Sequence, residues 1–281
     1  MVGNNPKDSV KPADYHTHTM LCHHAEGVPA DYMRAARAAG LDEIGISDHN
    51  PSPTLRDDWR MAPLDLPRYL DLVAQAMDEA ASGGGPTVRL GLECDFLPAE
   101  RPWLEELTAF APWDYFIGSV HYIAEGWDVD NPRWIGRFDR TGVEETWGLY
   151  WPRYVEAIRS GLFDIMGHPD LVKKFGHRPE GDLRRFYEPA IEALAETGTA
   201  FELNTAGWRK DCLEQYPARE FLELAAVAGV PVVVSSDAHK PGEVGSRFDE
   251  AVALLRESGF RRLARFEGRR RRLVPIDDDP T

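Results

Sequence analysis

The sequence is poor in cysteine and in basic residues. Its 281 residues include three cysteines, too few and too scattered for a disulfide framework, so we expect a protein of a reducing compartment. Lysine and arginine number 32 against 47 aspartate and glutamate residues, which gives a formal net charge of −15. Nucleic-acid binding relies on neutralising phosphates, and so acidic a chain is poorly suited to it. We therefore predict no nucleic-acid partner.

Long apolar segments and nucleotide-binding motifs are also missing. No apolar run approaches the ~18 residues that a membrane span needs, and residues 1–13 lack the apolar core of a signal peptide. We expect a cytoplasmic protein without a membrane partner. Neither glycine-rich phosphate-binding motif, GxGxxG or GxxxxGKS/T, occurs in the chain, so there is no nucleotide fingerprint.

Seven short apolar segments alternate with helical patterns. A first strand is expected to end at His18, and the others at 42–49, 87–93, 115–121, 162–168, 199–204 and 230–237. This alternation predicts a parallel sheet with helical crossovers. At this length a closed single-domain α/β barrel is the natural form, with an open doubly wound sheet as the alternative. The domain is expected over 13–276, between an N-terminal tail (1–12) and an acidic C-terminal tail (277–281).

Histidines and carboxylates gather at the ends of these strands. On a strand, His16 and His18 face the same side and can point two imidazoles at one spot. In a βα barrel the carboxyl ends of the strands form one mouth, so the groups should meet there. Imidazole mixed with carboxylate suits Zn²⁺, Mn²⁺ or Fe²⁺. The candidate metal ligands are His16, His18, His24, His49, Glu93, His121, His168, Asp237 and His239.

Several motifs carry a family resemblance. Asp-Tyr-His-Thr-His, Ser-Asp-His, Gly-Leu-Glu, Ser-Val-His, Gly-His-Pro-Asp and Ser-Asp-Ala-His, in this order, resemble the PHP (polymerase and histidinol phosphatase) superfamily. The passages 91–96, 116–122 and 202–210 are similar to its histidinol-phosphatase branch. The resemblance runs from about residue 14 to about residue 260. It implies a distorted (β/α)7 TIM-like barrel, a single domain and three bound divalent metal ions.

The resemblance also implies how the ligands are shared. His16, His18, Glu93 and Asp237 would hold one ion; Glu93, as a bridge, would share a second with His121 and His168; and His24, His49 and His239 would hold the third. His23 lies beside His24, so the assignment of that ligand is open by one residue. The implied activity is metal-dependent hydrolysis of L-histidinol phosphate to L-histidinol and phosphate, in histidine biosynthesis. A metal-bridging hydroxide would attack phosphorus, with Glu93 and Asp237 as the catalytic residues.

Cationic and supporting side chains can be assigned to this chemistry. Arg209 and Lys173 follow two of the strands and are expected to bind the phosphate of the substrate, although ordinary surface charges are the alternative. Asp48 and Asp170 are candidates to orient ligand histidines, or else to cap loops. The tryptophans at 127, 134 and 208 either wall a pocket or pack in the core. The basic run 269–272 is read as a solvated edge that pairs with the acidic residues 277–279.

Two other functions remain open from the sequence. One is hydrolysis of another small phosphoester, such as a nucleotide or an oligonucleotide end. The other is a non-catalytic metal-binding module, against which the complete ligand set argues. The long segment 122–140 is more consistent with a closed pocket for a small molecule than with an open groove. The sequence does not determine the oligomeric state.

Overall fold

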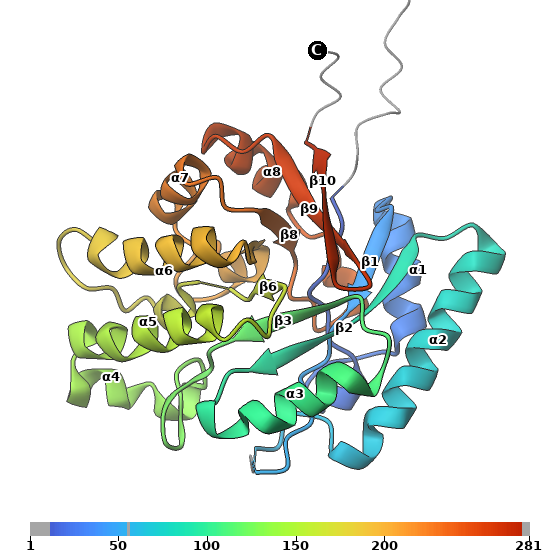
Figure 1. Ribbon diagram of the computed structural model, residues 1–281, viewed down its shortest axis with the longest axis horizontal. Coiled ribbons are helices and arrows are strands. Elements are labelled where there is room, and N and C mark those ends of the chain that lie inside the picture. The colour runs from blue at the N-terminus through green and yellow to red at the C-terminus, as the bar shows by residue number, and fades with distance from the viewer. Residues whose placement is uncertain (1–11, 55–56, 277–281) are drawn as a thin grey trace, which may run out of the picture.

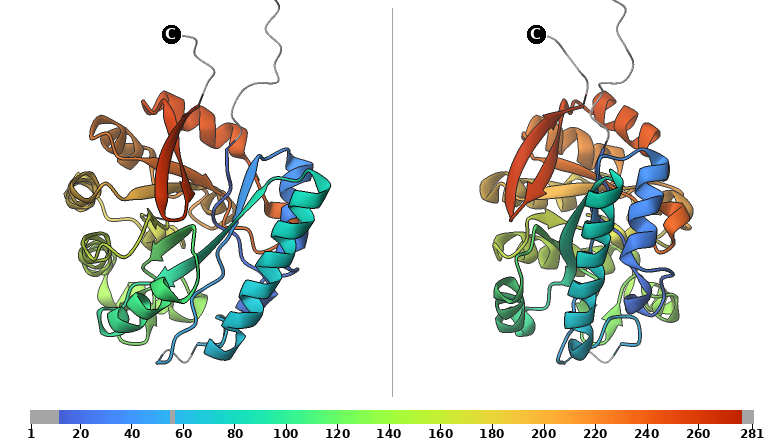
Figure 2. Two further views of the ribbon diagram at one scale, coloured as in Figure 1. Left: turned by 45° about the vertical axis from the view of Figure 1, so that its right-hand side comes forward. Right: turned by 90° about the vertical axis from the view of Figure 1, so that its right-hand side faces the viewer.

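A curled parallel sheet forms the centre of the protein. The computed structural model describes residues 12–54 and 57–276, so most of the predicted tails, 1–11 and 277–281, lies outside the described residues. The sheet order is β1-β2-β3-β6-β7-β8. These strands are β1 (Glu43–Ile46), β2 (Thr87–Asp95), β3 (Tyr115–Ser119), β6 (Ile165–Met166), β7 (Ala200–Asn204) and β8 (Val232–Ser235). The predicted α/β barrel class is confirmed, and Figures 1 and 2 show helices surrounding the curled sheet.

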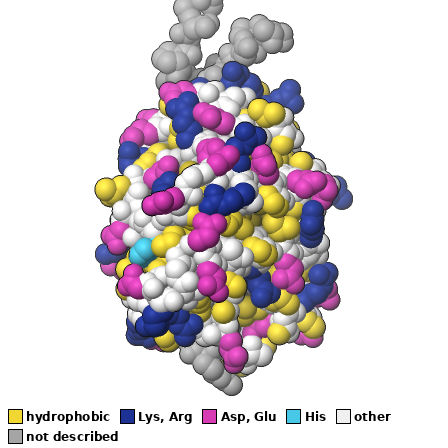
Figure 3. Space-filling view, turned by 90° about the vertical axis from the view of Figure 1, so that its left-hand side faces the viewer, with side chains coloured by type: hydrophobic (Ala, Val, Ile, Leu, Met, Phe, Trp, Pro, Cys, Tyr) yellow, Lys and Arg dark blue, Asp and Glu magenta, His cyan; other side chains and the backbone are white. Residues whose placement is uncertain are grey.

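Amphipathic helices form the outer layer. They are α1 (Pro29–Ala39), α2 (Leu66–Gly83), α3 (Arg101–Phe110), α4 (Gly136–Thr141), α5 (Val143–Arg159), α6 (Arg184–Thr197), α7 (Arg219–Val227) and α8 (Phe248–Glu257). In α2 the buried residues Leu66, Tyr69, Val73, Ala76 and Ala80 recur every three or four positions, so one stripe of the helix faces the sheet. On the face that bears α5 and α6, acidic and basic side chains are interspersed with hydrophobic ones (Figure 3). The described helices include none that is long and apolar enough to cross a membrane.

The segment 14–18 is not a regular strand, so the prediction of a first strand there is wrong. The segment 14–18 makes two isolated bridges, from Asp14 to Ile44 in β1 and from Thr17 to Ala238 just after β8. Gly45 N donates to Asp14 O at 2.8 Å, and His18 N donates to Ala238 O at 2.8 Å. The segment therefore joins the two edges of the six-stranded sheet and takes the place of a seventh strand.

A C-terminal hairpin, which the sequence analysis did not predict, covers the end of the barrel opposite the carboxyl ends of the parallel strands. It consists of β9 (Arg262–Glu267) and β10 (Arg270–Pro275), paired antiparallel. Its Phe266 packs edge-on against Tyr15, with ring centroids 6.0 Å apart, inside the barrel. Arg269 bonds Asp164 at 2.9 Å and Arg272 lies 3.7 Å from Glu43, so the basic run pairs with these acids. The predicted partners 277–279 lie outside the described residues.

Glycines make room for a tyrosine in the barrel interior. A Cβ added to Gly45 or Gly91 would lie 2.0 Å or 2.4 Å from atoms of the Tyr115 side chain. Tyr115 is fully buried, and its hydroxyl donates to the Tyr15 carbonyl at 2.6 Å. This hydrogen bond ties β3 to the segment 14–18, the closing segment of the barrel, because Tyr15 belongs to that segment and immediately precedes His16.

The segment 122–140 is ordered rather than a long irregular loop. It contains a short hairpin of β4 (Tyr122–Ala124) and β5 (Trp127–Asp128), a turn of 3₁₀-helix at Pro132–Trp134, and most of α4. Val129 N donates to the carbonyl of His121 at 2.7 Å, which holds the segment beside the strand ends.

Candidate metal centre

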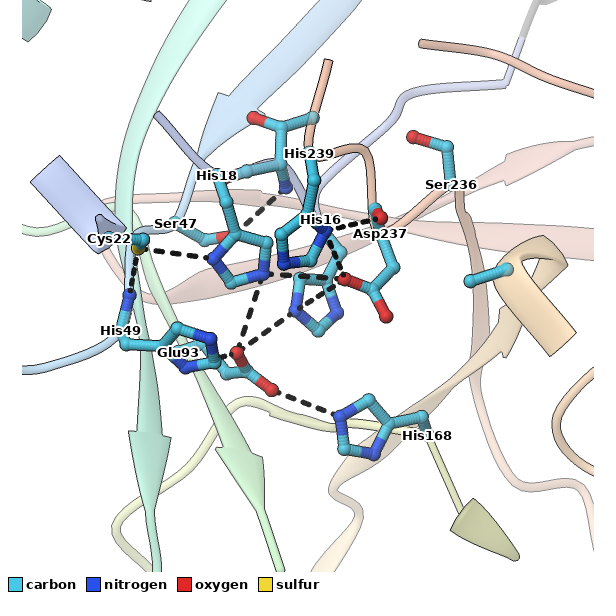
Figure 4. A network of polar contacts seen from close by, with 12 residues as sticks. His16, His18, Cys22, Ser47, His49, Glu93, His168, Ser236, Asp237 and His239 are labelled. Atoms are coloured by element: carbon cyan, nitrogen blue, oxygen red, sulfur yellow. Dashed lines mark hydrogen bonds and ion pairs between the residues drawn. The ribbon is translucent and has the colours of Figure 1, made fainter. Parts of the chain in front are cut away.

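All nine candidate ligands meet at the carboxyl ends of the strands. They come from the closing segment (His16, His18), the first loop (His24), the ends of β1 and β2 (His49, Glu93), and the loops after β3, β6 and β8 (His121, His168, Asp237, His239). Figure 4 shows the group around Glu93, with imidazoles directed at its carboxylate. A cavity of about 540 Å³ opens over them. The strand ends therefore position the ligands as the sequence predicts.

Glu93 lies at the centre of the group. Its Oε2 is 3.3 Å from His16 Nε2 and 3.5 Å from His18 Nε2. Its Oε1 is 3.0 Å from His168 Nε2 and 3.6 Å from His121 Nε2. Oε2 also lies 2.8 Å from His49 Nδ1. The two oxygens therefore face different groups of histidines, which is the arrangement that a bridging carboxylate requires.

The remaining ligands form two neighbouring groups. Asp237 Oδ1 lies 3.4 Å from His18 Nε2 and 3.9 Å from His16 Nε2. His24 and His239 bring their Nε2 atoms within 2.9 Å of each other, and they form a possible metal-binding group with His49. Of the two adjacent histidines it is thus His24, rather than His23, that faces the other ligands.

Two ligands have unusual backbone conformations. His168 and Asp237 have φ values of 45° and 50°, in the left-handed region that non-glycine residues rarely adopt. Both lie just after a strand, where the chain turns away from the sheet. Such strain clusters at functional sites, where it is retained because it aims a side chain.

Buried groups hold the ligand rings in place. Glu202 in β7 has both carboxylate oxygens 3.0 Å from His16 Nδ1, and Asp95 in β2 lies 2.7 Å from His121 Nδ1. Cys22 Sγ lies 3.4 Å from His18 Nδ1. The sequence analysis did not single out Glu202 or Asp95. The available signal was a carboxylate inside an apolar strand for Glu202, and the same-face position two residues after Glu93 for Asp95.

The two aspartates proposed to orient histidines have other partners. Asp48 accepts hydrogen bonds from Thr19, at 2.5 Å from its backbone N and 2.6 Å from its hydroxyl. Asp170 accepts from Lys173 Nζ at 2.7 Å and from Ala218 N at 2.8 Å. Both therefore brace loops, the alternative role that the sequence left open.

The electrostatics of the cluster keep its carboxylates ionised and shift the pKa values of its imidazoles in both directions. Burial opposes the charge of Glu93, but the imidazoles of His49 and His16 prevail and hold its pKa well below the usual range. The same balance, with His16 foremost among the imidazoles, holds the pKa of Asp237 well below its usual value. Burial lowers the pKa of His49 well below normal and that of His239 to about 3. Burial also opposes the charge of His16 and His121, but Glu202 beside His16 and Asp95 beside His121 raise the pKa of both rings well above normal. Ionised carboxylates and neutral imidazoles are the forms that bind metal ions.

Several of these buried atoms face one another without making a hydrogen bond in the described residues. They are His16 Nε2, His18 Nε2, His49 Nδ1 and Glu93 Oε2. Buried polar atoms are normally hydrogen-bonded, so four convergent exceptions require an explanation. Nitrogen and carboxylate oxygen donors within 4.8 Å of one another form a suitable set for a divalent cation. The residues therefore fit divalent metal binding.

The cations nearest the cavity differ partly from those expected. Lys173 is fully buried, and its ammonium bonds Asp170, Glu214 (2.6 Å) and the Gln215 carbonyl (2.8 Å), away from the cavity lining. Its neighbour Lys174 lines the cavity, as does Lys210.

Arg209 lies beside the site, where Nη2 donates to the Ser236 carbonyl at 3.0 Å. Among the tryptophans, Trp59, which the sequence analysis did not single out, lines the cavity, and Trp134 lines an adjoining one. Trp127 is buried in the core. The guanidinium carbon of Arg247 lies over the Trp208 ring, 4.1 Å from the ring centroid.

Known proteins share both the sequence pattern and the fold. The PHP domain family model matches residues 14–206. The chain is 43% identical to a probable histidinol-phosphatase of Deinococcus radiodurans, over 88% of this chain and 94% of that protein. It is 27% identical to a histidinol-phosphatase of Bacillus subtilis, over 84% of this chain and 96% of that one. Among solved structures, the histidinol phosphate phosphatase of Lactococcus lactis, complexed with zinc, L-histidinol and phosphate, matches with a TM-score of 0.76 at 22% identity, over 93% of this chain and 99% of that one.

Proposed function

Because the chain belongs to the PHP domain family, we propose that it is a histidinol-phosphatase that hydrolyses L-histidinol phosphate to L-histidinol and phosphate, in histidine biosynthesis. The observation that carries this proposal is the coincidence of two findings. The chain resembles histidinol-phosphatases along almost their full length, and its nine candidate nitrogen and carboxylate ligands converge beside one cavity, lined by seven of them, that is large enough for a small phosphomonoester.

We further propose that the centre holds three divalent ions, of zinc, manganese or iron. The separate directions of the two Glu93 oxygens support a bridge between the first ion, with His16, His18 and Asp237, and the second, with His121 and His168. The group of His24, His49 and His239 supports a third position. When bound, such ions lower the pKa of a water molecule and neutralise charge on phosphoryl oxygens.

The chain's own residues prepare the site for this chemistry. We propose Glu93 and Asp237 as the catalytic carboxylates, since both are held ionised at the floor of the cavity. Lys174 and Lys210 line the cavity and are proposed to bind the phosphoryl group, together with Arg209 at its edge. Lys173 is proposed instead to fix the loop that carries Tyr216, another residue of the cavity lining.

A panel of phosphomonoesters tests the function. The metal-loaded protein is assayed for phosphate release from L-histidinol phosphate, a nucleoside monophosphate, a 3′-phosphorylated oligonucleotide and phosphoserine. We expect kcat/KM for L-histidinol phosphate to exceed the others by about 100-fold or more, which corresponds to about 2.7 kcal/mol of selective transition-state binding. Equal or greater efficiency on a nucleotide or an oligonucleotide end would overturn the proposal in favour of the alternative substrate. Inactivity on the whole panel would favour the non-catalytic reading.

A further inference from the structure

A second cavity adjoins the one over the candidate ligands. It measures about 580 Å³ and shares part of its lining with the first cavity, including Trp59 and Asp128. The Trp59 ring stands between the two: its centroid is 4.4 Å from that of His49 on one side and 6.3 Å from that of Tyr122 on the other. A molecule whose phosphoryl group lies over the histidines can therefore extend past Trp59 into the second cavity through a short carbon chain.

The walls of the second cavity are aromatic. Trp59 and Tyr122 are nearly parallel, with an interplanar angle of 12°, and Trp134 also lines the space. The Tyr122 hydroxyl donates to Asp57 at 2.9 Å, and Arg60 pairs with Asp57 at 2.8 Å and packs 4.3 Å from the Trp59 ring centroid. These contacts hold the rings in place before any ligand arrives. Aromatic surfaces of this kind suit a planar ring, in particular one that carries positive charge.

The arginines near and in the lining of the second cavity pair with carboxylates other than Asp128. Asp57 is paired with Arg60, Arg133 lies 3.9 Å from Asp58, and Arg153 bonds Glu156 at 3.0 Å. Among the residues that the structure describes, none of these arginines makes an ion pair with Asp128.

Asp128 is only 5% exposed, yet within the described residues it accepts two long hydrogen bonds and no ion pair. The donors are Asp130 N and Asn131 Nδ2, each at 3.3 Å. Its neighbour Asp130 already pairs with Lys174 at 2.7 Å. Within the described part of the chain, the buried acid at the junction of the two cavities therefore makes no ion pair.

We propose that the second cavity is the leaving-group subsite, which takes an alcohol bearing a planar heteroaromatic ring and a protonated amine, with Asp128 accepting hydrogen bonds from the ammonium group and Trp59 and Tyr122 facing the ring. The inference rests on the proposed function and deepens it. Asp128 acts here as a specificity-determining residue, because it distinguishes phosphomonoesters that carry the amine from those that lack it. The loss of a hydrogen bond to a charged group reduces binding about 10–100-fold.

The test compares two substrates that differ only in the amine. They are L-histidinol phosphate and 3-(imidazol-4-yl)propyl phosphate, which keeps the ring and the phosphate. Asp128→Asn preserves size and removes the charge, and Asp139→Asn on α4, exposed and outside both cavities, is the matched control. We expect Asp128→Asn to lower kcat/KM about 10–100-fold for the amine-bearing ester and less than about threefold for the other, at equal metal content. Asp139→Asn should leave both values unchanged.

Two further measurements keep the proposal falsifiable. Asp128→Glu retains the charge and should keep most of the preference for the amine, which guards against a folding defect in the first variant. The affinity for L-histidinol, which has no phosphate, can be measured by calorimetry without turnover and reports on the subsite alone. This affinity should weaken about tenfold or more in Asp128→Asn. Equal losses on both esters, or none on either, would overturn the subsite while leaving the proposed function intact. A parent protein that releases no phosphate from L-histidinol phosphate would overturn the proposed function itself.

Discussion

Replacing Glu202 by glutamine should loosen metal binding without disturbing the fold. Glu202 is fully buried in β7, both its oxygens are 3.0 Å from His16 Nδ1, and Asn204 Nδ2 donates to Oε1 at 2.8 Å. A carboxylate in this position fixes the ring so that Nε2 points at the metal, and it increases the electron density on that nitrogen. Glutamine keeps the volume and one acceptor oxygen but loses the charge.

The expected loss of metal affinity follows from the change in the hydrogen bond between residue 202 and His16. A hydrogen bond to a charged group contributes about 1.5–3 kcal/mol, and a neutral one about 0.5–1.5 kcal/mol, so Glu202→Gln should cost about 1–1.5 kcal/mol. This corresponds to roughly a tenfold weaker affinity for one metal ion, at the lower end of the 10–100-fold range known for such partners. The other ions should bind as before, because His24, His49 and His239 make no hydrogen bond to Glu202 in the structure.

The assay is a competition titration of metal-free protein against a chromophoric chelator, with metal content checked by elemental analysis. The control is Glu196→Gln on α6, whose carboxylate is 55% exposed and pairs with Arg159 at the surface. Thermal unfolding of the metal-free proteins should show little difference between the two variants. An affinity for Glu202→Gln within twofold of the parent would refute the idea that the Glu202 charge supports His16.

Other changes should separate ligands from supporting residues. Chelation should abolish phosphate release, and adding back Mn²⁺, Zn²⁺ or Fe²⁺ should restore it; full activity in metal-free protein would refute the mechanism. Glu93→Ala should remove more than one equivalent of metal while the fold survives, and unchanged metal content would show that Glu93 is not a bridge. Arg209→Ala should lower kcat/KM about 10–100-fold at unchanged metal content if Arg209 contacts the phosphoryl group; kinetics like those of the parent would exclude it. Lys173→Met should instead lower the free energy of unfolding by about 3–5 kcal/mol, because it leaves the fully buried Asp170 without its cation, and a stability equal to the parent's in urea unfolding would contradict this.

The convergence of the candidate metal ligands was predictable because they follow a local rule. Apart from His16 and His18 in the segment 14–18, each lies at or just beyond the end of an apolar strand or in the first loop, and parallel strands bring their carboxyl ends to one side of a barrel. The alternation of strands and helices was equally visible, because side-chain periodicity within one element depends on neighbours along the chain. The sequence alone therefore determined the fold class and the residues that meet in the cavity.

What surrounds those ligands depended on contacts between distant segments. Glu202 is 186 positions from His16, and only the closure of the sheet by the segment 14–18 brings them together. Lys173 and Lys174 are adjacent in sequence, but the 3₁₀ turn Leu171–Lys173 directs one into a buried ion pair and leaves the other at the cavity. Likewise Trp59 lies in the loop before α2 and Asp128 in β5, and the fold brings both into the lining of the two cavities. Side-chain direction and long-range pairing are set by packing in three dimensions, so only the tertiary structure decided which charged groups support the fold and which face the substrate.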